Sequence, residues 1–274
     1  MPRLDQEWHE GLAEAIQALD SPRFAPSLAR ALRRVAPFDY TVIFAYQGEE
    51  RPLDLFDDFG PDKRGIFVTV YQAGPYLLDP FYHAARGGIE AGLYRMRDLA
   101  PDRFYQSEYY RSYYVQTGLA EEIVLFLSPG PGVTVAMSLM RAGHSPAYSE
   151  REMAQLRSVA PVVIALAERH WRGLPQRFVL EPVAAPADDA LREAFTAFGR
   201  HRLTQREYEV VALVLRGHSS EAIGAALGIA PGTVKIHRKN IYAKLGIGSQ
   251  AELFSMFVNS LGGGKTVSRR RASA

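Results

Sequence analysis

Residues 203–254, which decide the architecture of the C-terminal part of the chain, read LTQREYEVVALVLRGHSSEAIGAALGIAPGTVKIHRKNIYAKLGIGSQAELF. Thr204, with Glu207 three residues later, forms the capping-box pattern that begins a helix. Gly217 is placed to end that helix, because glycine adopts the left-handed conformation of a helix C-terminus without steric cost. The stretch therefore predicts a short helix at its start, the first of four.

A second and a third helix follow, separated by a tight turn at residues 228–230. Ser219 or Ser220 caps the second helix, and Pro231 is a favoured first-turn residue for the third. The third helix, expected over 231–245, has its apolar residues Val234, Ile241 and Leu245 on one face and Lys235, Ile236, Arg238, Lys239 and Tyr242 on others. This pattern is typical of a helix-turn-helix that fills the major groove, and the alternative is a four-helix packing unit with a solvated cationic face.

The two parts of the chain differ in charge. Residues 200–274 contain 12 Lys and Arg against 4 Asp and Glu, whereas residues 1–199 contain 20 against 26. A basic end on an acidic body suggests that only the end meets a polyanion such as nucleic acid. The alternative is a solvated tail, because four of these charges come from Lys265, Arg269, Arg270 and Arg271.

The C-terminal stretch contains several short motifs. They are Leu203-Thr204 with Arg206-Glu207, Gly217-His218-Ser219, Leu227-Gly228-Ile229, Thr233-Val234-Lys235 with His237, and Asn240-Ile241-Tyr242 with Lys244-Leu245. With these motifs the stretch resembles the LuxR-type helix-turn-helix domain. The resemblance implies a transcription activator that binds an inverted repeat in promoter DNA as a homodimer and contacts RNA polymerase.

The resemblance also implies roles for individual residues. Lys235, Ile236 and Lys239 are expected to face bases, and Thr233, His237, Arg238, Asn240 and Lys244 to contact phosphates. Lysine donates to guanine acceptors and isoleucine contacts a thymine methyl, which fits these roles. His237 has the alternative of packing within its helix. The last helix, from Gln250 to Asn259, is expected to expose Leu253 and Phe257 for dimerisation.

Three positions depart from the family pattern, and one of them is Gln250, which stands where many members have arginine. Ala230 stands where the family usually has a capping serine, which weakens the start of the third helix by about 1 kcal/mol. Gly224 occupies a usual alanine position, which lowers helix propensity by up to about 1 kcal/mol.

The first 170 residues alternate between helical and strand-like patterns. We expect helices over 6–36, 62–115 and 149–171, and strands over 40–46, 53–59, 122–128 and 133–141. Ser149 and Glu152 form a capping box for the last of these helices. The fold class is therefore α+β, with an N-terminal α-β-α sandwich around an antiparallel sheet and a C-terminal all-α four-helix domain.

Composition and motifs exclude several classes of protein. The chain has no cysteine, and its histidines lack metal-ligand spacing, so we expect no disulfide and no metal site. No hydrolase, zinc-protease or phosphate-loop motif occurs, so we expect no enzyme and no cofactor beyond an unidentified small-molecule effector. A phospho-receiver domain needs a lysine late in its sheet, whereas Lys63 is the only lysine before Lys235. No apolar stretch reaches the roughly 20 residues of a membrane span, so we expect a cytoplasmic protein.

Aromatic residues are dense between Phe67 and Tyr114, where tyrosines either line an apolar pocket or pack a core. Within this segment, Asp79 precedes Pro80 and is either a ligand acceptor or a helix cap. Residues 37–170 resemble the autoinducer-binding domain of quorum-sensing LuxR-type regulators, which is related to PAS and GAF sheets.

That second resemblance implies a ligand site. Asp79 would accept a hydrogen bond from a ligand amide, Tyr94 stands at the position of a pocket tryptophan, and Tyr71 or Tyr76 replaces a pocket tyrosine. Glu122 stands near an expected glycine, and this disfavours an acyl-homoserine lactone as the ligand. The alternative is an N-terminal domain that only dimerises or binds another protein.

These patterns give an expected division of the chain. We expect a sensor domain over 1–172, a linker with a short helix over 173–199, the DNA-binding domain over 200–261 and a disordered basic tail over 262–274.

Overall fold

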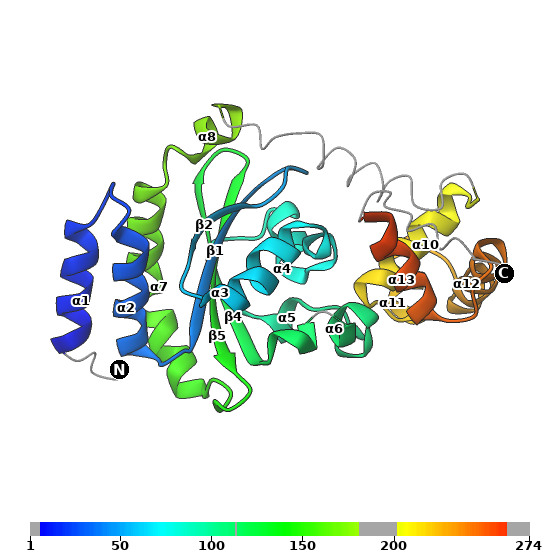
Figure 1. Cartoon of the computed structure of the whole chain (residues 1–274), viewed down its shortest axis with the longest axis horizontal. Helices are drawn as coiled ribbons and strands as arrows, with labels where there is room; N and C mark the ends of the chain where they lie inside the picture. The colour runs from blue at the N-terminus through cyan, green and yellow to red at the C-terminus, as the bar shows by residue number, and fades with distance from the viewer. Residues whose placement is uncertain (1–5, 113, 181–201, 262–274) are drawn as a thin grey trace, which may run out of the picture. The chain divides into compact units, whose positions relative to one another are not determined.

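A computed structural model describes residues 6–112, 114–180 and 202–261. The chain divides into two compact units, residues 1–183 and 184–274. The first is an α-β-α sandwich and the second is all-helical, so the predicted fold class is confirmed (Figure 1). The short helix predicted at 189–198 and the predicted tail lie outside the described residues.

The middle layer of the first unit is an antiparallel sheet. In the described residues its five strands follow the order β2-β1-β5-β4-β3. The strands are β1 (Tyr40–Gln47), β2 (Leu53–Asp57), β3 (Gly92–Arg95), β4 (Leu119–Gly130) and β5 (Val133–Ala142). Four of them lie where the sequence predicts strands, whereas β3 corrects the prediction of a mainly helical stretch over 62–115. This edge strand is only four residues long, too short for an alternating pattern to stand out.

Helices cover both faces of the sheet (Figure 1). On one face lie α1 (Gln6–Gln17), α2 (Phe24–Val35) and α7 (Glu150–His170). The other face carries the short helices α3 (Pro61–Arg64), η1 (Gly65–Val70), η2 (Pro75–Leu78), α4 (Pro80–Arg86), α5 (Met96–Leu99), η3 (Phe104–Gln106), α6 (Glu108–Ser112) and η4 (Tyr114–Thr117). The capping box predicted for α7 is confirmed, with the Ser149 and Glu152 side chains bonded reciprocally to each other's backbone N–H.

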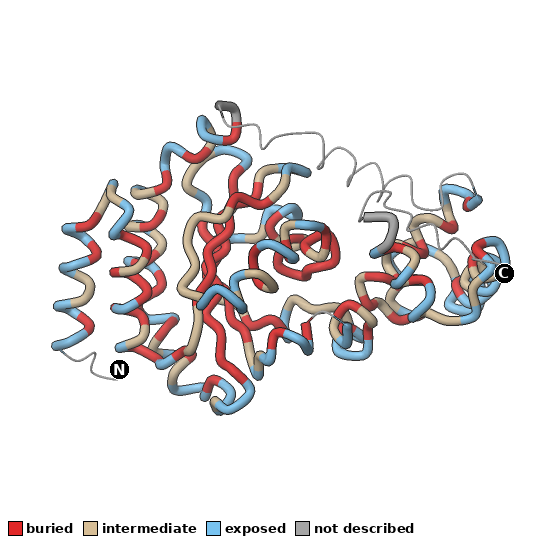
Figure 2. Tube along the Cα trace, viewed as in Figure 1, coloured by how far each residue is buried: buried red, intermediate tan, exposed pale blue. Residues whose placement is uncertain are grey.

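The strands of the sheet are largely buried, as Figure 2 shows. Strand alternation divides their buried side chains between the two faces. Ile43 and Ala45 of β1 join the core with α1, α2 and α7. Phe44 and Tyr46, next to them in sequence, are buried under the short helices instead. Because both faces are covered, polar residues at the alternate positions of these strands are enclosed rather than solvated.

The predicted linker begins later than residue 173. Residues Leu174–Leu180 form α8, and the side chains of Leu174 and Phe178 are buried in the N-terminal core. This helix is only seven residues long and contains a proline, so it shows little periodicity, and the sequence pattern did not reveal it.

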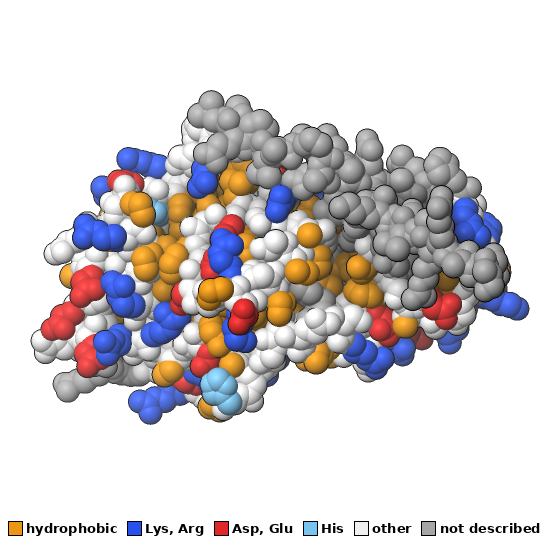
Figure 3. Space-filling view, in the orientation of Figure 1, with side chains coloured by type: hydrophobic (Ala, Val, Ile, Leu, Met, Phe, Trp, Pro, Cys, Tyr) orange, Lys and Arg blue, Asp and Glu red, His pale blue; other side chains and the backbone are white. Residues whose placement is uncertain are grey.

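Charged side chains of both signs are interspersed over α1 and α2, on the face that Figure 3 presents. Pairs such as Arg34 with Glu7 and Arg30 with Glu14 join these two helices. This surface therefore lacks the single-sign field that attracts a polyanion.

The second unit contains α10 (Gln205–Arg216), α11 (Ser220–Leu227), α12 (Pro231–Leu245) and α13 (Gln250–Leu261). The predicted capping box of Thr204 and Glu207 is confirmed, as is the left-handed Gly217 that ends α10. Ser219 caps α11, and Ala230 provides no side-chain cap to α12. In the described residues no helix is long and apolar enough to cross a membrane.

The glycine at position 224 is explained by close packing, which helix propensity alone did not suggest. A Cβ atom at this position would lie 2.7 Å from the backbone oxygen of Ile229. The glycine therefore allows α11 to lie close against the turn that precedes α12.

Candidate functional site

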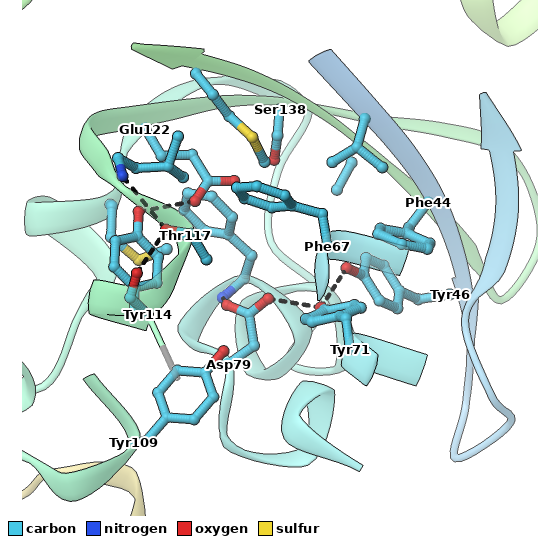
Figure 4. Close-up of a pocket in the computed structure, with 16 residues that line it drawn as sticks. Phe44, Tyr46, Phe67, Tyr71, Asp79, Tyr109, Tyr114, Thr117, Glu122 and Ser138 are labelled. Atoms are coloured by element: carbon cyan, nitrogen blue, oxygen red, sulfur yellow. Dashed lines mark hydrogen bonds between the residues drawn. The ribbon is translucent and has the colours of Figure 1, made fainter. Parts of the chain in front are cut away.

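A cavity of about 40 Å³ lies between the sheet and the short helices of the first unit (Figure 4). Its lining residues are Val42, Phe44, Tyr46, Phe67, Tyr71, Asp79, Phe81, Met96, Tyr109, Tyr114, Thr117, Leu119, Glu122, Ala136, Ser138 and Met140. A cavity of this size holds on the order of one to three water molecules. The walls are mainly aromatic, with a small number of polar groups that converge on the space.

Asp79 has one of the two roles that the sequence left open, that of a helix cap, and it also lines the cavity. It is the N-cap of α4, because its Oδ1 accepts a hydrogen bond of 2.9 Å from the Phe81 N–H. Its Oδ2 accepts a 2.6 Å bond from the Tyr71 hydroxyl, which lies 3.0 Å from the Tyr46 hydroxyl. Burial raises the pKa of Asp79 to about 6, although both hydrogen bonds oppose the shift. The carboxyl group therefore caps a helix and faces the cavity.

Glu122 is a second acid in the cavity wall, which the sequence reasoning did not identify as a site residue. It projects from β4, and its Oε2 accepts a 2.9 Å bond from the Tyr114 hydroxyl. Burial raises its pKa to about 7, and the negative charge of Asp79 contributes to the shift. Glu122 precedes Ile123 in a strand that is buried on both faces. Because Ile123 points into the core with α1, α2 and α7, Glu122 points to the other face of the sheet. This alternation is the feature of the sequence that could have identified Glu122.

The structure brings together only part of the predicted ligand site. Asp79 and Tyr71 line the cavity, whereas Tyr76 is buried behind it and packs edge-on against Tyr82. Tyr94 lies on the edge strand β3, where its hydroxyl donates to the Glu90 backbone oxygen at 3.1 Å. Tyr76 and Tyr94 therefore do not line this cavity, and their role in binding a ligand stays a prediction. The pairing of β3 with β4, which the sequence did not reveal, sets the position of Tyr94. Tyr46, Tyr109 and Tyr114 line the cavity instead.

The candidate DNA-binding surface lies on α12. Val234, Ile241 and Leu245 are buried, which confirms the predicted apolar face. The residues predicted to face bases are exposed, and Ile236 keeps 60% of its surface accessible. Of the residues predicted to contact phosphates, Thr233 and Asn240 are exposed and His237 and Arg238 are half-buried.

Two basic side chains of α12 have partners within the unit. Arg238 lies 3.3 Å from the side-chain oxygen of Gln250 at the start of α13. The Lys244 amine donates a 2.7 Å bond to Glu207, whose side chain is only 5% exposed. Burial opposes ionisation of Glu207, but hydrogen bonds from Lys244 and Thr204 prevail and lower its pKa. Lys244 thus holds α12 to the start of α10, and its phosphate contact stays a prediction.

We expect Lys244→Ala to lower the free energy of unfolding of the second unit by about 1–2 kcal/mol, because it leaves a buried carboxylate without its cation. Urea unfolding followed by circular dichroism measures this loss, with Lys239→Ala as the exposed-lysine control. Unchanged stability together with a weaker salt dependence of DNA binding would favour the phosphate contact.

The residues predicted for dimerisation are not exposed. Leu253 and Phe257 retain 1% and 0% of their surface, so these side chains are part of the interior rather than an interface. Among the side chains of α13 that the structure describes, Val258 is a large apolar residue with 42% of its surface exposed. The helical period predicted the apolar face of α13 correctly but could not say whether that face met the same chain or a second copy.

Comparison with known proteins gives a family for the chain. Residues 201–257 match the family model "Bacterial regulatory proteins, luxR family". An HTH-type transcriptional regulator from the exeN 3′ region of Aeromonas salmonicida is 38% identical over 186 residues, which cover 67% of this chain and 94% of that protein.

Comparison with solved structures also gives matches to this chain. The LBD domain of VqsR from Pseudomonas aeruginosa aligns with 61% of this chain and 99% of its own, at 28% identity and a TM-score of 0.53. A structure of SdiA from Escherichia coli aligns with 93% of this chain and 97% of its own, at 16% identity and a TM-score of 0.42. The match to the curated relative and the match of the helix-turn-helix lead to one conclusion: the chain belongs to the LuxR family of bacterial transcriptional regulators.

Proposed function

We propose that the chain is a dimeric, sequence-specific regulator whose DNA binding is controlled by a small molecule in the N-terminal cavity. Control by a small molecule is supported by the aromatic cavity, on which two buried acids and several tyrosine hydroxyls converge. Sites for small molecules are typically apolar spaces with a small number of such polar groups. The similar VqsR domain, named as an LBD, supports the same assignment.

The DNA-binding half of the proposal rests on the exposed face of α12. Lys235, Ile236 and Lys239 are free to reach base edges, where lysine reads guanine and isoleucine contacts thymine. Thr233, His237, Arg238 and Asn240 are proposed to position the helix on the phosphates.

Dimerisation follows from the small number of bases that one such module reads, since two modules related by twofold symmetry read an inverted repeat. We place the contact of the DNA-binding units on the exposed side of α13, at Val258. A footprint that covers both half-sites and a stoichiometry of two chains per duplex would agree with this arrangement. One chain on one half-site would contradict it.

A cavity-filling variant tests the control by a small molecule. Ala136 lines the cavity from β5, so Ala136→Leu adds three carbon atoms to a space of about 40 Å³. We expect low-molecular-weight extracts of bacterial cells to raise the melting temperature of the wild-type chain but not that of Ala136→Leu. The reason is that a ligand that binds only the folded state stabilises that state.

Ala120→Leu is the matched control, because Ala120 is exposed on β4 and does not line the cavity. It should respond to the extracts like the wild type. An equal response of Ala136→Leu would place the ligand elsewhere. No response in any of the three proteins would favour an N-terminal unit that only dimerises or binds another protein.

A further inference from the structure

The charge of the cavity wall is unbalanced. Asp79 and Glu122 are 7% and 6% exposed, and among the lining residues there is no lysine, arginine or histidine. The donors that the two carboxyl groups receive are neutral. They are the Phe81 N–H and the Tyr71 hydroxyl for Asp79, and the Tyr114 and Ser138 hydroxyls for Glu122. Neither pKa shift includes a contribution from a basic side chain.

Other acids of low exposure in the described residues are compensated differently. Glu207 is bonded to Lys244, and Glu121, whose side chain is 13% exposed, is bonded to the guanidinium of Arg95 at 2.7 Å. Asp57, at 8%, pairs with Arg64 at 2.9 Å. The fold thus supplies a cation to these carboxylates and supplies none to the pair in the cavity. A buried carboxylate without a cation is strongly disfavoured, so the missing charge identifies what a ligand would bring.

The walls around the two acids suit an organic cation. Phe44, Tyr46, Phe67, Tyr71, Phe81, Tyr109 and Tyr114 contribute aromatic rings to the cavity. Aromatic faces attract ammonium and guanidinium groups, and they also accommodate an aliphatic body. A metal ion is less well served, because in the described residues no group of three or more His, Asp or Glu side chains is placed to hold one.

We propose that the cavity binds a compact organic ammonium ion, whose charged group is held by Asp79 and Glu122 and whose apolar body contacts the aromatic walls. This proposal rests on the proposed function, since it names the ligand class of the same site. Asp79 receives the ligand from the side of α4 and Glu122 from the side of β4 (Figure 4). A single ammonium group has three donors, enough to bridge both carboxylates and one hydroxyl.

The experiment compares charged probes with neutral probes of matched shape. The full chain is titrated at pH 8 with methylamine and ethylamine, with methanol and ethanol, and with N-butyryl homoserine lactone, at constant ionic strength. The melting temperature of the N-terminal unit is read by tryptophan fluorescence. We expect the amines to stabilise the wild-type chain at concentrations at least about tenfold lower than the alcohols and the lactone.

Variants identify the site. Glu122→Gln keeps the size of the side chain and an oxygen for Tyr114, but loses the charge. We expect it to weaken the response to the amines at least about tenfold and to leave the response to the alcohols unchanged. Glu90→Gln, at an exposed position of the same unit, should behave like the wild type.

The outcomes separate the ligand class from the function. If the neutral lactone stabilises the chain and the amines do not, the proposal of a cationic ligand is wrong, whereas the proposed sensory function stands. Equal amine responses of the wild type and Glu122→Gln would overturn the site. If no probe stabilises the chain, the ligand class is also overturned, and the response of Ala136→Leu to extracts then decides whether the cavity binds any small molecule.

Discussion

Glu122→Gln is expected to raise the free energy of unfolding of the N-terminal unit by about 3 kcal/mol at pH 8. Burial raises the pKa of Glu122 from 4.5 to about 7, so the folded state binds a proton that the unfolded state releases. The wild-type unit is therefore most stable below about pH 4.5 with respect to this group, and it loses that stability as the pH rises through about 7. Glutamine has no proton to lose, and the variant should escape the loss.

Asp79 adds to the same pH dependence over a lower window. Its pKa is raised from 3.8 to about 6, so its contribution is lost between these values as the pH increases. Urea unfolding of the wild type at pH 5 and pH 8 should therefore show a lower midpoint at pH 8, and the difference should be smaller in Glu122→Gln.

Fluorescence is a suitable probe because both tryptophans of the chain, Trp8 and Trp171, are buried in the N-terminal unit. Glu90→Gln serves as the control for loss of an exposed carboxylate. If the stability of the wild type and that of Glu122→Gln depended on pH in the same way, the pKa of Glu122 would not be raised by folding. The description of Asp79 and Glu122 as a buried acid pair would then be wrong.

Loss of Lys235 and Lys239 is expected to have the largest effect on DNA recognition. Each alanine substitution should reduce the preference for the cognate site over a scrambled site by about 1–3 kcal/mol, which is roughly 5- to 150-fold. The reason is geometric: both amines are exposed on the face of α12 that lies opposite the buried Val234 and Ile241.

Asn240→Ala provides the matched comparison, because the proposal assigns this exposed residue of α12 to phosphate rather than to bases. It should weaken binding to both sites alike. Fluorescence anisotropy with a duplex selected from random sequences, at two salt concentrations, measures both quantities. A preference that survives in Lys235→Ala and Lys239→Ala would refute the assigned reading face.

The DNA-binding unit was predictable from its sequence because its signals are local. The caps at Thr204 and Ser219 and the stop at Gly217 act within a turn of their own helices, and the structure confirms each of them. Leu253 and Phe257, which are buried although the sequence predicts exposure, depend on contacts that are not local. Periodicity identifies an apolar face, but burial depends on which surface meets it.

The cavity was predictable only in part, because it depends on contacts between distant segments. Asp79 and Tyr71 are eight residues apart, and both were identified. Glu122 and Tyr46 reach the cavity through the register of β4 and β1 with β5, which the sequence did not specify. The position of Tyr94 was not foreseen for the same reason, since it follows from the pairing of β3 with β4.

The strand that carries Glu122 also determines where the chain leaves the N-terminal unit. At the far end of β4, Gly130 lies against Pro175 of α8, so closely that a Cβ atom at residue 130 would be 2.7 Å from the proline ring. Helix α8 is therefore seated on a strand that forms part of the cavity wall. A Gly130→Ala substitution would push α8 away from β4 without altering a lining residue of the cavity, so the seating of α8 depends on a single backbone position.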